Sequence, residues 1–309
     1  MTGVVIKSTG SWYVVRDQAS GQLHRCRLRG KFKHKGLKVS NPLAVGDVVE
    51  FAPEVAEAEG AGVITAIEPR RNYIIRRSVH KSEHAHIVAA NLDQALLVVT
   101  LVSPATSFGF IDRFLVTAEA YHIPARLIFN KADLYDDDTL DYQRQVAAMY
   151  ASVGYPSVLC AAEPGENVAA VAALLPGQTS LLSGHSGVGK STLINALVPD
   201  LDLKTAEISA FSDKGKHTTT FAEMLEVAPG TYLIDTPGIK ELGLVDVPAA
   251  ELAGYFPEMR ALLGQCRYHN CRHVHEPGCA VIAAVDQGQL AVPRYESYLS
   301  MLADEDNRH

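Results

Sequence analysis

Short runs of β-forming residues, separated by turns, recur through the first 68 positions of the chain. Each run is bounded by turn residues, and together they predict β-strands near 3–6, 12–15, 23–28, 47–51 and 62–67. Short strands at this close spacing are typical of a small barrel, and the OB-fold is built from about five of them. We therefore expect an OB-like β-barrel over residues 1–68.

Residues 68–72 break this pattern, and from about residue 92 apolar runs alternate with stretches of helical periodicity. The apolar runs predict strands at 94–102, 125–129, 157–161, 179–183 and 231–234. Helices are expected near 111–122, 139–153, 166–174 and 189–198. This alternation predicts an α/β domain with a largely parallel sheet over residues 69–244, followed by a mainly helical domain over residues 245–309.

The composition is that of a folded protein, with 47% hydrophobic and 20% charged residues among 309. Such values exclude wholesale disorder. The apolar stretches fall short of the ~20 residues that span a bilayer, and the N-terminal residues lack the pattern of a secretion signal. We therefore expect a cytoplasmic protein with no membrane segment. Five cysteines, three of them crowded near the C-terminus, suit a metal site better than disulfides in that compartment.

Charge is distributed unevenly along the chain. Residues 1–82 hold 14 Lys+Arg against 7 Asp+Glu, a net +7, and the remainder carries a net −14. Every odd position from Arg25 to Lys35 is basic, so an extended strand would place these charges on one face, with Cys26 and Leu28 on the other. A basic run is often only a solvated strand face, but its place in a basic OB-like module favours contact with nucleic acid. Further basic residues that could extend the face are Lys38, Arg70, Arg71, Arg76, Arg77 and Lys81.

A glycine-rich segment carries the clearest chemical signal. It reads Gly-His-Ser-Gly-Val-Gly-Lys-Ser and fits the phosphate-loop pattern G-x-x-x-x-G-K-[ST] between a predicted strand and a predicted helix. Backbone N–H groups of such a loop wrap the phosphates, while Lys190 reaches the β- and γ-phosphates and Ser191 coordinates Mg²⁺. The residues expected to hold the phosphates are Gly184, His185, Ser186, Gly187, Val188, Gly189, Lys190, Ser191 and Thr192.

A second motif follows the predicted strand 125–129. Asn130-Lys131-Ala132-Asp133 matches the N-K-x-D guanine motif of GTPases. The carboxylate of Asp133 would accept hydrogen bonds from guanine N1–H and N2–H₂, which adenine cannot supply, so ATP should be rejected. After the next strand, Cys160, Ala161 and Ala162 resemble the short backbone loop that supports the base.

A third motif, Asp235-Thr-Pro-Gly238, follows the last predicted strand of the domain. Asp235 can meet Mg²⁺, and the backbone N–H of Gly238 can approach the γ-phosphate. The order of the three motifs is unusual, because the base motif precedes the phosphate loop. We therefore expect a circularly permuted P-loop GTPase that binds GTP or GDP with Mg²⁺, in which the segment at 235–238 leads directly into the C-terminal domain.

These features resemble one family, the bacterial ribosome small subunit-dependent GTPase A family (RsgA), over nearly the whole chain. The most specific residues are the runs 215–220 and 235–244, the C-terminal cysteines, and Arg294 to Tyr298. The resemblance implies a GTP hydrolase that binds rRNA, is stimulated by the small (30S) ribosomal subunit late in its maturation, and couples hydrolysis to release. We also expect a monomer.

The resemblance also implies catalytic residues in the segment His-Thr-Thr-Thr. The family's threonine that senses Mg²⁺ and the γ-phosphate maps best to Thr219, with the threonines on either side left open. Ile239 stands where a Ras-like enzyme has its water-orienting glutamine, so intrinsic hydrolysis should be slow. His217 is the family's candidate to orient water in its place, the alternative being a solvent-exposed loop histidine. The expected catalytic residues are therefore His217, Thr219 and Lys190.

Three cysteines and a histidine lie close together near the C-terminus, in a spacing suited to a closed structural zinc site. His269 and His275 are nearby alternatives for the imidazole, and the family pattern selects His273. The expected ligands of one structural Zn²⁺ are Cys266, Cys271, His273 and Cys279. Cys26 and Cys160 fall inside predicted strands and are expected only to pack.

Two other functions are open on the sequence. One is a GTP-controlled RNA-binding placeholder in ribosome assembly with little catalytic role of its own. The other is an ATPase or small-molecule kinase with an accessory zinc module, which the guanine motif at 130–133 disfavours.

Overall fold

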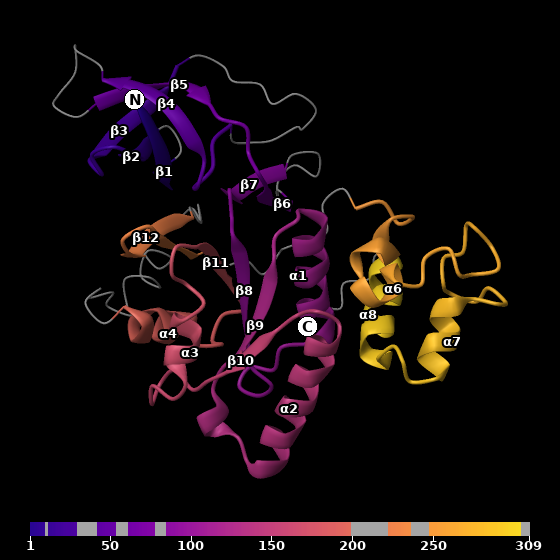
Figure 1. Cartoon of the computed structure of the whole chain (residues 1–309). Helices are drawn as coiled ribbons and strands as arrows, with labels where there is room; N and C mark the ends of the chain where they lie inside the picture. The colour runs from indigo at the N-terminus through magenta and orange to yellow at the C-terminus, as the bar shows by residue number, and fades with distance from the viewer. Residues whose placement is uncertain are drawn as a thin grey trace, which may run out of the picture.

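The structure is a computed structural model, and it describes residues 1–9, 12–29, 42–53, 61–77, 85–198, 222–235 and 247–303. Three modules follow one another along the chain, a barrel, a sheet flanked by helices, and a small helical module (Figure 1). Their proposed limits remain 1–68, 69–244 and 245–309. Within the described ranges, no helix has both the length and the apolarity needed to cross a membrane.

The N-terminal module is a closed barrel. Its strands are β1 (Thr2–Ser8), β2 (Tyr13–Asp17), β3 (Leu23–Leu28), β4 (Val48–Pro53) and β5 (Ala61–Ile67). The hydrogen-bonded order is β1-β2-β3-β5-β4, and β4 returns to pair with β1. Only β3 and β5 run parallel among these neighbours. Alternate residues fill the interior, among them Val5, Val15, Cys26, Phe51 and Ile64. The OB-like barrel expected from five short, closely spaced strands is confirmed.

The central module contains the parallel sheet predicted from the apolar runs. Strands β8 (Gln94–Val99), β9 (Ala125–Phe129), β10 (Ser157–Leu159), β11 (Thr179–Ser183) and β13 (Thr231–Asp235) run parallel in the order β10-β9-β8-β11-β13. Three further strands were not predicted from the pattern. They are β12 (Glu223–Ala228), which is antiparallel to β13, and the separate hairpin of β6 (Tyr73–Arg77) and β7 (Ala85–Ala90).

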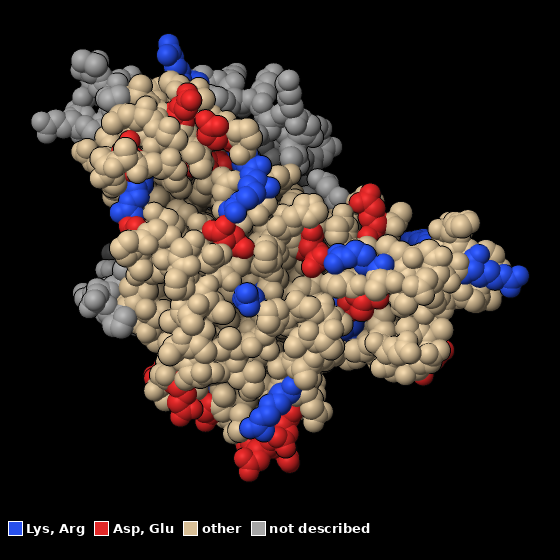
Figure 2. Space-filling view, in the orientation of Figure 1, with Lys and Arg blue, Asp and Glu red and all other residues tan. Residues whose placement is uncertain are grey.

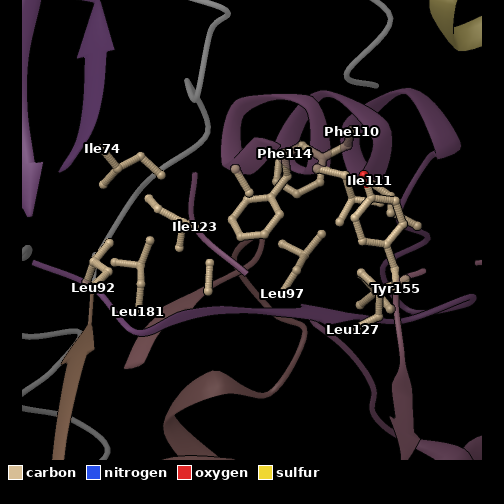
Figure 3. Packing of buried hydrophobic residues seen from close by; sticks show 14 of the residues in the cluster. Ile74, Leu92, Leu97, Phe110, Ile111, Phe114, Ile123, Leu127, Tyr155 and Leu181 are labelled. Carbon is tan, nitrogen blue, oxygen red and sulfur yellow. The ribbon is translucent and has the colours of Figure 1, made fainter. Parts of the chain in front are cut away.

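Helices cover both faces of this sheet because successive strand residues point to opposite sides. On one face, residues such as Leu97 and Leu127 pack under α1 (Phe108–Ala120) and α2 (Asp137–Ser152). Figure 3 shows Ile111 and Phe114 of α1 above these sheet residues. The other face packs under α3 (Val168–Ala172) and α4 (Lys190–Leu197). The result is the three-layer α/β arrangement that the sequence predicts.

The C-terminal module is small and mainly helical, as expected. It contains the 3₁₀ turn η2 (Leu252–Tyr255) and the helices α6 (Pro257–Arg260), α7 (Ala280–Asp286) and α8 (Val292–Leu302). The module packs against the side of α1, away from the barrel (Figure 1). Val116 of α1 belongs to its hydrophobic core, together with Phe256 and Tyr298.

Candidate functional site

The phosphate loop joins the end of β11 to the start of α4, the strand–loop–helix order that the motif requires. Two of its glycines are required by close approach as well as by backbone conformation. A Cβ on Gly184, at φ +147°, would lie 2.5 Å from the carbonyl oxygen of Val98. A Cβ on Gly189, at φ +92°, would lie 2.4 Å from Nδ2 of Asn130. The loop therefore sits tightly against β8 and the base motif.

Asn130 connects the candidate nucleotide motifs to one another. Its side chain, 2% exposed, donates from Nδ2 to the carbonyl oxygen of Val188 in the phosphate loop at 2.9 Å. Its Oδ1 accepts from the backbone N–H of Ala162 at 2.9 Å. One buried amide thus fixes the base motif, the phosphate loop and the segment 160–162 relative to each other. Ala161 is also buried there, and Cys160 is buried with its pKa raised to about 11 by desolvation, as packing predicts.

The rest of the base motif lies at the end of β9. Lys131 adopts a left-handed backbone conformation at φ 66°, and its Nζ donates to the carbonyl oxygen of Ser103 at 2.7 Å. Asp133 follows in the 3₁₀ turn η1 (Ala132–Leu134) and is exposed. Its carboxylate is therefore open to solvent beside the buried Asn130, as a base-binding group must be before the ligand arrives.

The lysine of the phosphate loop is bound to the loop's own backbone, and a carboxylate lies near enough to influence its charge. Lys190 begins α4 and donates from Nζ to the carbonyl oxygens of Gly184 and His185, both at 2.7 Å. Burial lowers the pKa of Lys190, and the nearby charge of Asp235 opposes that shift. Asp235 ends β13 in register with Leu182 of β11, so it lies at the carboxyl edge of the sheet. This edge is where open α/β sheets bind their ligands.

Ser191 and Thr192 follow Lys190 in the first turn of α4. Oxygen donors such as Ser191 and Asp235 fit Mg²⁺ bound to nucleotide phosphates. Gly238, His217 and Thr219, and with them the expected switch segment and the position of Ile239, lie outside the described residues. One contact of the phosphate loop could not be predicted from the sequence, because the residue of α1 that makes it belongs to no motif. The ring of Phe110 in α1 contacts the ring of His185 in a tilted arrangement, with ring centroids 4.2 Å apart.

The four expected zinc ligands come together in the C-terminal module. The ligand atoms of Cys266, Cys271, His273 and Cys279 all lie within 4.8 Å of one another. Nδ1 of His273 is 3.5 Å from Sγ of Cys266 and 3.3 Å from Sγ of Cys279. Three thiols and one imidazole are a donor set that suits tetrahedral zinc. Burial lowers the pKa of His273, which favours the neutral imidazole that a metal needs. The alternatives His269 and His275 are exposed and outside this group.

Glu276 organises the loop that carries His273, a role with no signal in the sequence. Its carboxylate accepts from the backbone N–H groups of Arg272, Val274 and His275 at 2.7, 2.8 and 3.0 Å. These hydrogen bonds lower the pKa of Glu276 to about 2. The loop is thereby held while His273 adopts a positive φ of 60°.

The basic face is described only in part. Arg25 and Arg27 are exposed on β3 while Cys26 between them is buried, as the alternation predicts. The Arg25 guanidinium lies 4.4 Å from the ring centroid of Trp12. Arg70 does not extend this face, because its guanidinium is bound to buried Asp47 at 2.6 and 2.7 Å. The side chains of the remaining candidates lie outside the described residues, apart from Arg29 and Arg71.

Comparison with known proteins identifies the two larger modules. The family model "RsgA N-terminal domain" matches residues 2–64, and "RsgA GTPase" matches residues 67–245. A protein of Bacteroides fragilis named small ribosomal subunit biogenesis GTPase RsgA is 52% identical over 306 residues, covering 99% of this chain and 97% of its own. One of the same name from Cytophaga hutchinsonii is 51% identical, covering 99% of each chain.

Solved structures agree over the whole length. The crystal structure of YjeQ from Thermotoga maritima, 36% identical, matches with a TM-score of 0.78 and covers 100% of this chain and 99% of its own. YloQ, described as a circularly permuted GTPase and 30% identical, matches with a TM-score of 0.73 over 100% and 96% of the two chains. The expected permutation is therefore confirmed. The chain belongs to the RsgA family of circularly permuted GTPases.

Proposed function

We propose that this GTPase acts in the assembly of the small ribosomal subunit, and that the subunit stimulates its hydrolysis of GTP to GDP and phosphate. The observation that carries the proposal is the junction at Asn130, which assembles a guanine motif and a phosphate loop into one site. Relatives that share about half of the sequence over its full length are named for small-subunit biogenesis.

Within this site, each group has a distinct proposed task. Asp133 accepts from the guanine edge, and the loop from Gly184 to Ser191 holds the phosphates with its N–H groups. Ser191 and Thr219 would hold Mg²⁺, with Asp235 beside them, and the metal would neutralise charge on the phosphates. Lys190 stabilises charge that develops on the transferred phosphoryl group. His217 is proposed to orient the attacking water, because Ile239 cannot.

The charge distribution favours one orientation on RNA. Arg25 and Arg27 are exposed on the barrel, with Trp12 stacked against the first of them. Figure 2 shows acidic side chains at the opposite end of the molecule, in the region of α2, whose first turn contains Asp137 and Asp138. RNA phosphates would be attracted to the first end and repelled from the second. We therefore propose that the barrel contacts rRNA, in the cytoplasm, and that hydrolysis leads to release of the protein.

Measuring GTP turnover with and without purified small subunits tests this function. We expect a slow basal rate that small subunits increase by at least about an order of magnitude, because the subunit supplies an activating environment that Ile239 cannot. Large subunits at the same concentration are the control. A stimulated rate equal to the basal rate would leave only the GTP-controlled placeholder.

The variant Asp133→Asn provides a matched control for the nucleotide site. Its amide should favour xanthine over guanine nucleotides, because the changed base edge matches the changed side chain. If small subunits stimulate hydrolysis of XTP by this variant, the activity takes place at the site that contains Asn130 and Asp133. Equal affinity of the unaltered protein for ATP and GTP would contradict the assignment.

A further inference from the structure

A buried ionic network joins the C-terminal module to the nucleotide-binding module. Arg294 of α8 is 1% exposed, and its Nη1 donates to Oδ1 of Asp112 in α1 at 2.7 Å. The same guanidinium donates to both carboxylate oxygens of Glu258 in α6, at 2.7 and 3.0 Å. From α2, the hydroxyl of Tyr150 donates to Oδ1 of Asp112 at 2.8 Å. A carboxylate of one module is thus paired with a cation of the other.

The surroundings hold this pair in one geometry. The ring of Phe256 lies 4.7 Å from the guanidinium carbon, and the rings of Tyr150 and Tyr155 lie at 5.7 and 5.6 Å. Burial raises the pKa of Asp112, although Arg294 and hydrogen bonds from Ser297 and Tyr150 oppose the shift. The two carboxylates outweigh the effect of burial on Arg294 and raise its pKa. The guanidinium is therefore the hydrogen-bond donor of this pair, and Oδ1 of Asp112 is the acceptor.

The same turn of α1 touches the phosphate loop. Phe110, two positions before Asp112, contacts the ring of His185 in a tilted arrangement with an interplanar angle of 31°. Just before the helix, Pro104 approaches the loop so closely that a Cβ on Gly187 would lie 3.4 Å from its Cδ. Ile111 and Phe114 pack the helix onto the sheet beneath (Figure 3). One rigid turn therefore contacts the phosphate loop at Phe110 and holds the C-terminal module at Asp112.

We infer that Arg294 is a positioning residue for the phosphate loop, acting through Asp112 and the first turns of α1. This inference rests on the proposed nucleotide site. A shift of Asp112 moves Phe110 against His185, because both belong to one helical turn. Coupling between binding sites is reciprocal, so a nucleotide in the loop must also stabilise the docking of α8.

The experiment combines nucleotide release with hydrogen exchange on the zinc-loaded, full chain. For Arg294→Lys, which keeps the charge but loses the forked contact to Asp112 and Glu258, we expect fluorescent GDP to dissociate at least about fivefold faster. In the unaltered protein, GDP should slow amide exchange in α8. Phe110→Leu, which leaves the ion pair intact, should remove this GDP-dependent protection without changing the zinc content.

Arg260→Gln is the matched control. Arg260 pairs with Glu119 at 2.8 Å and also joins the C-terminal module to α1, but at the end of the helix remote from the loop and with half of its side chain exposed. Its substitution should leave GDP release and the protection of α8 unchanged.

The possible outcomes distinguish a failure of the proposed nucleotide site from a failure of the positioning role of Arg294. If the unaltered chain does not bind GDP, the proposed nucleotide site itself fails. If it binds GDP but Arg294→Lys releases it at the unaltered rate with full zinc, and Phe110→Leu keeps the GDP-dependent protection of α8, the positioning role is wrong. Should Arg294→Lys lose its zinc or fail to fold, the exchange of α8 in Phe110→Leu alone decides the question.

Discussion

The barrel and the C-terminal module are attached to the GTPase module in physically different ways. The barrel is joined by strand pairing, with Lys7 of β1 opposite Glu223 of β12, so that one 11-stranded sheet runs through both modules. The charged side chains of this joint are accessible to water, at 36% and 50% exposure for Lys7 and Glu223, while Val45 of the barrel module is buried against Ala89 of β7. The C-terminal joint instead buries Arg294 and Asp112 at 1% and 0% exposure.

The two joints differ in how precisely they fix the position of each module on the GTPase module, and not only in how much free energy they contribute. Exposed ion pairs contribute about 0–1 kcal/mol and are screened by salt, so they tolerate small shifts. A buried pair contributes little net stability, yet losing one partner costs about 3–5 kcal/mol. The C-terminal module is therefore held in one register against α1. In the sequence, the barrel joint is close to the expected switch segment, since β12 begins at Glu223, shortly after Thr219.

Removing a zinc ligand should have the largest effect on stability, because the C-terminal module depends on the metal for its folding. Structural zinc supplies folding free energy of about 10–16 kcal/mol in zinc-finger peptides. We expect about one zinc per chain, and Cys271→Ser should lower it and open the C-terminal module to proteolysis. GDP binding should survive better than the module does. Full nucleotide binding by unaltered protein that contains no zinc would contradict the metal assignment.

The next effect comes from breaking the buried ion pair. Arg294→Met leaves Asp112 buried without its cation and should lower the free energy of unfolding by about 3–5 kcal/mol. The urea midpoint of the zinc-loaded protein measures this change. Arg260→Met, which breaks the exposed pair between the same modules, is the control and should cost less than about 1 kcal/mol. Equal losses in the two variants would remove the distinction between buried and exposed contacts.

The joint between α1 and α8 shows which features of the structure could be predicted from the sequence and which could not. Signals that are local in the chain predicted β9 and β11 with their observed bounds, because each has consecutive apolar residues at its centre or end and is followed by an asparagine or a glycine. The role of Arg294 could not be predicted, since its partner Asp112 lies 182 positions away. Only the fold brings them together.

Missed elements have equally physical reasons. Strand β12 reads Glu-Met-Leu-Glu-Val-Ala, whose partly buried residues give neither clean alternation nor a continuous apolar run. Helix α1 was expected from residue 111 but begins at Phe108, because the hydroxyl of Ser107 caps it by accepting from the N–H of Phe110. In the site, the motifs predicted the phosphate loop and the four metal ligands, whereas Glu276 and Phe110 act through loop and packing geometry that no spacing reveals.

A smaller effect is expected from the loop around the zinc site. Glu276→Gln removes the charge that three backbone N–H groups satisfy, so His273 should be held less firmly. Groups that orient metal ligands typically change metal affinity about 10–100-fold. Competition with a chelator measures this affinity, and Glu296→Gln, an exposed position on α8, is the control. Unchanged affinity would show that the loop is held without Glu276.

The smallest effect belongs to the barrel joint. Lys7→Ala and Arg16→Ala remove the pairs with Glu223 and Glu226, and each should cost about 0–1 kcal/mol at low salt. In about 1 M salt, where the screening length falls to about 3 Å, the cost should vanish. Urea midpoints at the two salt concentrations give the comparison. Arg144→Ala, which breaks an exposed pair within α2, should show the same salt dependence without affecting the barrel. If the joint variants instead lose about 3 kcal/mol regardless of salt, the two joints are alike, and the barrel too is fixed by its side chains rather than by the pairing of β1 with β12.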